Sequence, residues 1–155
     1  MNASNNDDQN KQIELRLAAQ RKLAIQCEDL YEFCMDIVHN RFIPDDPAKD
    51  EELLKQLPDG KLPIDPKTGK PIDISKESFR KRADAASAAF TKLRRQILSI
   101  PLETLIEARN KLAAQISKIN ERIEKLSTIA TVIGNIADIA ILADQGLAIA
   151  AAAAP

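Results

Sequence analysis

The stretch that decides the fold is residues 78–100, which read SFRKRADAASAAFTKLRRQILSI. Its apolar side chains recur at alternating steps of four and three residues: Phe79, Ala83, Ala86, Phe90, Leu93, Ile97 and Ile100. An α-helix has about 3.6 residues per turn, so this spacing places them on one face as an unbroken heptad seam. Ser75 precedes the pattern and is a favourable helix N-cap. We therefore predict a helix over residues 75–99.

A similar pattern resumes after Pro101 and continues to about residue 150. One heptad position holds Leu105, Leu112, Ile119, Leu126, Ile133, Ala140 and Leu147, and the other holds Leu102, Ile116, Ile123, Ala130 and Ala137. The pattern predicts a helix over residues 101–150, with candidate breaks near Ser127 and at Gly134, where glycine weakens the helix. Pro101 disturbs a helix interior, so the chain either turns back or kinks there.

Another amphipathic pattern covers residues 9–42, and it predicts the first long helix. The apolar positions on its face are Ile13, Leu17, Leu23, Cys27, Leu30, Cys34 and Ile37. Gln20 interrupts this face, either as a polar residue that sets the helix register or as a position at its edge. Residues 1–8 consist mostly of Asn, Asp and Ser, and we expect a disordered tail there.

Residues 43–74 form a proline-rich connection that excludes a continuous long helix. Asp46 as N-cap and Pro47 at the first helical position predict one short helix. The residues Asp65-Pro66-Lys67-Thr68 suit a type I turn, and Gly69 suits the left-handed position that follows it. We expect a small hairpin-like loop at this point.

The composition fits these elements. The chain has 155 residues, of which 45% are hydrophobic, 29% charged and 3% aromatic. These values exclude a collagen-like chain, a disulfide scaffold and a wholly disordered chain. We predict an all-α single domain over residues 9–155. It is a bundle of three to four long amphipathic helices, with the proline-rich connection as a crossover that carries a short helix and a hairpin-like loop.

Charge is unevenly distributed although the net charge is only -1. Residues 75–125 carry 12 basic and 6 acidic side chains, and the rest of the chain is acidic. The basic cluster includes Arg82 and a candidate interaction face, which consists of Arg80, Lys81, Lys92, Arg94 and Arg95. It is either a solvated face that complements the acidic first helix and connection, or a contact site for an acidic partner or nucleic acid.

The C-terminal segment, residues 126–155, has no basic residue and is nearly all apolar. Its length suffices to cross a bilayer, which takes about 20 residues. Asp138 and Asp144 argue against a permanent membrane anchor, because each costs about 2.5–3.5 kcal/mol at mid-membrane. Three environments remain: the centre of the bundle, an interface between identical copies, or a membrane entered on assembly. The candidate assembly or membrane residues are Ile129, Val132, Ile133, Ile136, Asp138, Ile139, Leu142 and Leu147.

The sequence contains no recognisable constellation for catalysis. Cys27 and Cys34 are seven residues apart, about 10 Å along a helix, which is too far for a disulfide between them. They are either small buried hydrophobic residues or an intermolecular pair. His39 is the one histidine, too few for a zinc site built with these cysteines. With no glycine-rich phosphate loop either, we expect no enzyme activity, no metal and no cofactor.

Three functions stay open. The leading hypothesis is a non-enzymatic helical interaction protein that assembles through its coiled-coil-like seams, as a homo-oligomer or with a helical partner. The alternative is a membrane-active or pore-forming component that uses the apolar C-terminal helix. The third is binding of nucleic acid or another acidic partner through the basic face. Nucleic acid is the least favoured partner, because no nucleic-acid-binding motif is present. The polar N-terminus lacks a secretory pattern, so we expect a cytoplasmic protein.

Overall fold

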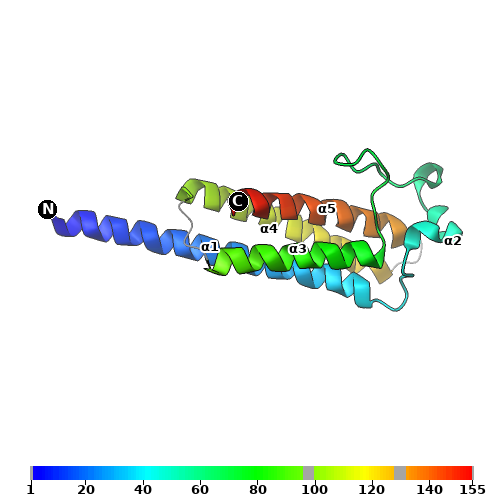
Figure 1. Ribbon diagram of the computed structural model, residues 1–155, viewed down its shortest axis with the longest axis horizontal. Coiled ribbons are helices and arrows are strands. Elements are labelled where there is room, and N and C mark those ends of the chain that lie inside the picture. The colour runs from blue at the N-terminus through cyan, green and yellow to red at the C-terminus, as the bar shows by residue number, and fades with distance from the viewer. Residues whose placement is uncertain (1, 96–99, 128–131, 155) are drawn as a thin grey trace.

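This computed structural model describes residues 2–95, 100–127 and 132–154. Within these ranges the chain is all-α, as predicted. The long helices are α1 (Asn2–His39), α3 (Lys76–Arg95), α4 (Leu102–Glu124) and α5 (Val132–Ala153). Figure 1 shows them side by side along the long axis, each running opposite to the one before it in the chain. Helices α1 and α5 each pack against both α3 and α4, which gives a four-helix bundle.

The proline-rich connection lies at one end of this bundle (Figure 1). It contains two 3₁₀ turns, Pro47–Lys49 and Pro58–Gly60, and the four-residue helix α2, Glu51–Leu54. The Asp46 side chain accepts a hydrogen bond from the Ala48 N–H at 3.2 Å and caps the first turn, as predicted. The predicted short helix is divided between a 3₁₀ turn and α2. The division falls at Asp50, whose side chain caps the N-terminus of α2.

The hairpin-like loop is also present. Ile64 and Pro71 form an isolated antiparallel bridge. The Asp65 N–H donates to the Lys70 carbonyl at 2.7 Å, and the Gly69 N–H donates to the Asp65 carbonyl at 2.8 Å. Gly69 has a φ of +69°, the left-handed conformation that the sequence predicted for it.

The boundaries of the first two helices differ from the prediction in part. Helix α1 ends at His39 and not at residue 42, since the Asn40 side chain accepts from the Phe42 N–H and bends the chain. It begins at Asn2, where we had expected a disordered tail over residues 1–8. Residues 6–15 are all exposed, so local backbone hydrogen bonds alone continue the helix there. In α3, the Ser75 hydroxyl accepts from the Ser78 N–H at 3.1 Å, which confirms the N-cap. Residues 96–99 of the predicted helix lie outside the described residues.

The predicted helix over residues 101–150 is two helices. Helix α4 ends at Glu124, a 3₁₀ turn follows at Lys125–Ser127, and α5 then packs back along α4. The break is near Ser127, one of the two candidate positions, whereas Gly134 lies inside α5. Pro101 is the N-cap of α4, and its carbonyl accepts from the Leu105 N–H at 3.2 Å. Helix α4 runs opposite to α3 (Figure 1). An uninterrupted heptad seam is equally compatible with two antiparallel helices whose apolar faces meet.

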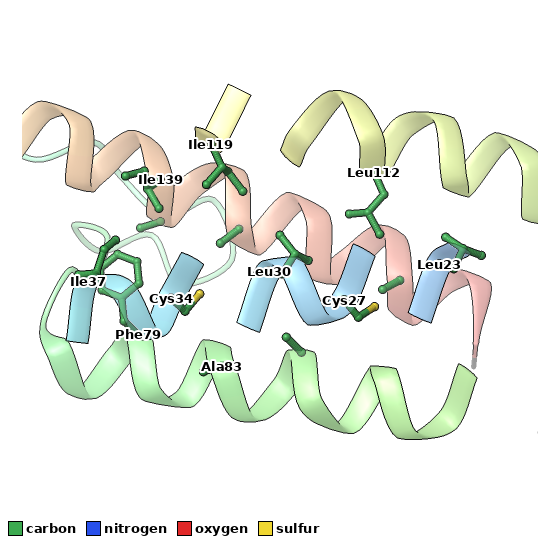
Figure 2. Close-up of a cluster of buried hydrophobic side chains, with 14 of the residues drawn as sticks. Leu23, Cys27, Leu30, Cys34, Ile37, Phe79, Ala83, Leu112, Ile119 and Ile139 are labelled. Carbon is green, nitrogen blue, oxygen red and sulfur yellow. The ribbon is translucent and has the colours of Figure 1, made fainter. Parts of the chain in front are cut away.

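The core is built from the predicted seams. Figure 2 shows the labelled side chains Leu23, Cys27, Leu30, Cys34, Ile37, Phe79, Ala83, Leu112, Ile119 and Ile139, which come from all four long helices. All of them are almost completely buried. Burial of one large apolar side chain contributes about 1.5–3 kcal/mol, so these layers provide the main stabilisation of the bundle.

Candidate functional site

The N-terminal half of α1 is the most accessible apolar part of the described long helices. Among the described residues, every exposed large apolar side chain that lies in a helix belongs to α1: Ile13, Leu15, Leu17, Ile25 and Tyr31. Ile13 is 53% exposed, whereas Ala19, less than two turns later, is 1% exposed. Figure 1 shows why: α1 extends past the ends of the other three long helices. The helix therefore continues outside the bundle. There Ile13 and Leu17 form an apolar stripe that the rest of the chain does not cover.

A groove of about 510 Å³ continues from this stripe between α1 and α3. The lining residues are Leu17, Gln20, Arg21, Ala24, Ile25, Glu28, Phe90, Leu93 and Arg94. Its apolar lining comes from both helices, and Arg21 and Arg94 add positive charge. The guanidinium of Arg94 lies 5.4 Å from the centroid of the Phe90 ring, a favourable cation–π geometry.

Gln20 fixes α1 against α3 at the floor of this groove. Its side-chain Nε2 donates to the Leu93 carbonyl at 2.6 Å, and the residue is 7% exposed. Gln20 is therefore buried and not an exposed edge position. The hydrogen bond favours one register of α1 along α3, since sliding either helix would leave a buried polar group unsatisfied.

The predicted basic face is exposed, but the basic cluster around it is only partly exposed. Arg80, Lys81, Lys92, Arg94 and Arg95 are exposed on α3, as a solvated face or a contact site requires. Arg82, which the sequence placed in the same cluster, is instead 8% exposed. Its Nε donates to Asp144 Oδ1 at 2.8 Å and its Nη2 to Asp144 Oδ2 at 3.2 Å. Arg82 thus joins α3 to α5 and is not available to a partner.

Arg82 also holds the end of the proline-rich connection. Its Nη1 donates to the Asp73 carbonyl at 2.9 Å and to the Ser78 hydroxyl at 2.8 Å. The guanidinium lies 4.9 Å from the centroid of the Phe79 ring. This network could not be predicted from the sequence, because Arg82 and Asp144 are 62 positions apart.

The candidate assembly or membrane residues of the C-terminal segment lie largely in the core. Ile133, Ile136 and Ile139 are fully buried, and Val132, Asp138, Leu142 and Leu147 are half-buried; Ile129 lies outside the described residues. Asp138 Oδ2 is 3.2 Å from Arg122 Nε on α4. This placement corresponds to the first of the three predicted environments, the interior of the bundle. Helix α5 is also the one described helix long and apolar enough to cross a bilayer.

The groups that most often perform chemistry are inaccessible or isolated. Cys27 and Cys34 are free thiols in the core, and burial raises their pKa to about 11 and about 12. A thiol reacts as its thiolate, so neither is a nucleophile near neutral pH. His39 is exposed at the C-terminal turn of α1. Among the described residues, no three His, Cys, Asp or Glu side chains are grouped so as to hold a metal ion.

Family models, curated proteins and solved structures give no match to this chain.

Proposed function

We propose that the chain is a non-enzymatic helical interaction protein whose binding element is the N-terminal half of α1. The observation that carries this proposal is the location of the exposed apolar side chains, which within the described helices are all on α1. The seams of α3, α4 and α5 are occupied by the chain's own core. Ile13 and Leu17 are four residues apart and lie on one helix face, as in helices that pair with another helix.

The chemistry of the chain supports binding over catalysis. Both thiols are buried and protonated near neutral pH. The one histidine, His39, lies in the C-terminal turn of α1 and does not line the groove. The groove combines apolar side chains with the charged residues Arg21, Glu28 and Arg94. Such a combination is usual for a protein-binding surface.

A display library of amphipathic helical peptides tests this proposal without knowledge of the natural partner. We expect peptides that bind the full chain but not the variant Ile13→Glu/Leu17→Glu. Ile64→Glu is the matched control, because Ile64 is 58% exposed but lies in the hairpin-like loop. Peptides that bind all three proteins equally, or no enriched peptides, would contradict the proposal.

A membrane-active component is the second candidate, and α5 is the observation that favours it. Over an 18-residue window the mean hydropathy of this helix is 1.6. Insertion requires α5 to leave the bundle, which breaks the pairs Arg82–Asp144 and Arg122–Asp138. This candidate therefore predicts release of α5 before membrane contact.

Leakage of dye from anionic vesicles tests the second candidate. Arg82→Gln removes the charged partner of Asp144 and is expected to increase leakage, whereas Lys81→Gln, an exposed neighbour, is expected to leave it unchanged. No leakage from any of the three proteins would exclude this candidate.

A further inference from the structure

We propose that the helical partner of α1 is a second copy of this chain, docked antiparallel along the N-terminal halves of the two α1 helices. This inference rests on the proposed function and specifies its partner. Three observations lead to it: the order of charges along α1, the position of the apolar stripe between them, and the projection of α1 beyond the bundle.

Charges of opposite sign flank the apolar stripe. Asp7 and Asp8 are exposed near the N-terminal end of α1. Arg21 lies on the other side of Ile13 and Leu17, and Arg94 of α3 lines the same groove. Charges of both signs, Lys11, Glu14 and Arg16, lie between them. An antiparallel pair places each acidic end beside the basic groove of the other copy and brings like charges together only at Glu14, near the centre, whereas a parallel pair in register places every charge of α1 beside its like.

The spacing of these residues fits one register. Asp7 and Arg21 are two heptads apart, so they lie on the same side of the helix. Pairing Asp7 of each copy with Arg21 of the other places a twofold axis near residue 14. Ile13 of each copy then lies beside this axis, about 3 Å along the helix from both Ile13 and Leu17 of the other copy, so these four side chains form the apolar contact. Such a pairing is closed, because each copy uses the same surface.

The shape of the molecule also favours this arrangement. In this register the partner's residues 6–10 lie beside residues 18–22, where the groove between α1 and α3 begins. Because α1 extends past the bundle (Figure 1), the two bundles lie end to end and do not overlap. A parallel pair would bring the two bundles side by side, where the described residues of α3, α4 and α5 include no exposed large apolar side chain.

Cross-linking of single-cysteine additions tests the register directly. A mixture of Asp7→Cys and Arg21→Cys chains, treated with a short bismaleimide, is expected to give a covalent dimer. Asp7→Cys alone is expected to give none, since residue 7 of the two copies is about 20 Å apart along the helix axis. Cys27 and Cys34 are buried and do not interfere. Asp7→Cys mixed with Ile64→Cys is the control and is expected to give no product.

Each outcome decides between the two proposals. A covalent dimer from Asp7→Cys alone indicates a parallel pair and overturns the antiparallel arrangement. No product from any mixture overturns self-docking. If stripe-dependent peptides are still enriched from the library in that case, α1 is a binding element for another helix and only the present inference fails. If neither is found, both fail.

Charge reversal provides an independent test by sedimentation equilibrium. The variants Asp7→Lys/Asp8→Lys and Arg21→Glu/Arg94→Glu are each expected to weaken their own dimer about tenfold, the order expected for several exposed ion pairs. An equal mixture of the two variants restores opposite charges at both ends and is expected to dimerise with nearly the original affinity. Two weak variants with no recovery in the mixture would contradict the charge argument.

Discussion

At the scale of single residues, the arginines of α3 show how position changes the role of one side chain. Arg80 and Arg82 are two positions apart, but Arg80 is exposed and Arg82 is buried with Asp144. Burial of a charge is costly unless it is paired and hydrogen-bonded, and Arg82 has acceptors on α5, on Ser78 and on the backbone of Asp73. Arg82 is a structural residue, and the surface available to a partner is correspondingly smaller.

Removal of Asp144 is expected to destabilise the bundle. Asp144→Ala removes the carboxylate that is paired directly with the buried guanidinium of Arg82, and we expect a loss of about 2 kcal/mol in the free energy of unfolding. Urea denaturation followed by circular dichroism measures it. Asp84→Ala, an exposed change on α3, is expected to stay within about 0.5 kcal/mol of the original. Equal effects of the two changes would contradict the structural role of Arg82. Arg82→Met/Asp144→Leu is expected to regain stability, because both charges are removed together.

The buried thiols predict a dependence of stability on pH. Burial raises the pKa of Cys27 to about 11 and that of Cys34 to about 12, from 9.0 in the exposed state. The unfolded chain therefore loses these protons at lower pH than the folded chain. The stabilisation is complete below pH 9 and is lost as the pH rises towards the folded values.

This prediction is checked against a chain without cysteine. Between pH 8 and pH 10.5, the free energy of unfolding is expected to fall more for the original chain than for Cys27→Ala/Cys34→Ala, which serves as the reference for all other titrating groups. Identical pH profiles would show that the two thiols are not buried as described.

At the scale of the element, α5 shows what a heptad pattern leaves undecided. The seam predicted which faces are buried, and Leu105, Leu112, Ile119 and Ile133 are all in the core. It did not distinguish one long helix from two that fold back on each other, because both arrangements bury the same positions. The Ser75 cap, the hairpin-like loop and the all-α class were predictable because they depend on residues close together in the sequence.

The part that could not be predicted depends on residues far apart in the sequence. The groove combines Leu17 with Phe90 and Leu93, and its orientation depends on the Gln20 side chain reaching the Leu93 carbonyl. The sequence placed the candidate assembly surface on the C-terminal segment because that segment has the least charge. In the bundle, that segment is covered by α3 and α4, whereas the more polar α1 keeps apolar residues exposed where it extends beyond its neighbours.

The two glycines of α5 are expected to respond differently to alanine. A Cβ at Gly134 would meet no atom within 4 Å, whereas one at Gly146 would lie 3.1 Å from Leu112 Cδ1 and 3.2 Å from Leu30 Cδ1. Gly134→Ala is therefore expected to stabilise the chain by about 0.5–1 kcal/mol through helix propensity. Gly146→Ala is expected to destabilise it by about 1 kcal/mol, because both leucines must move. Urea denaturation measures both, and equal stabilisation would mean that α5 does not approach α1 and α4 this closely.

At the scale of the whole molecule, a single chain supplies the complete core of the bundle, whereas the N-terminal half of α1 leaves apolar side chains exposed. The core connects α1, α3, α4 and α5, and Arg82–Asp144 secures α5 to it. Residues 6–18 of α1 add exposed apolar side chains to this body without contributing to its core. Such a division between a folded body and a projecting helix is suited to binding, and it allows the binding residues to be changed without unfolding the protein.

The mass of the full chain in solution tests this account most directly. Light scattering over a range of protein concentrations is expected to show a rise from 17.1 kDa towards twice that value. Ile13→Glu/Leu17→Glu is expected to stay a folded monomer, and Ile64→Glu is expected to dimerise like the original chain. A mass of 17.1 kDa at every concentration, or a dimer that persists when Ile13 and Leu17 carry charge, would contradict self-assembly through α1.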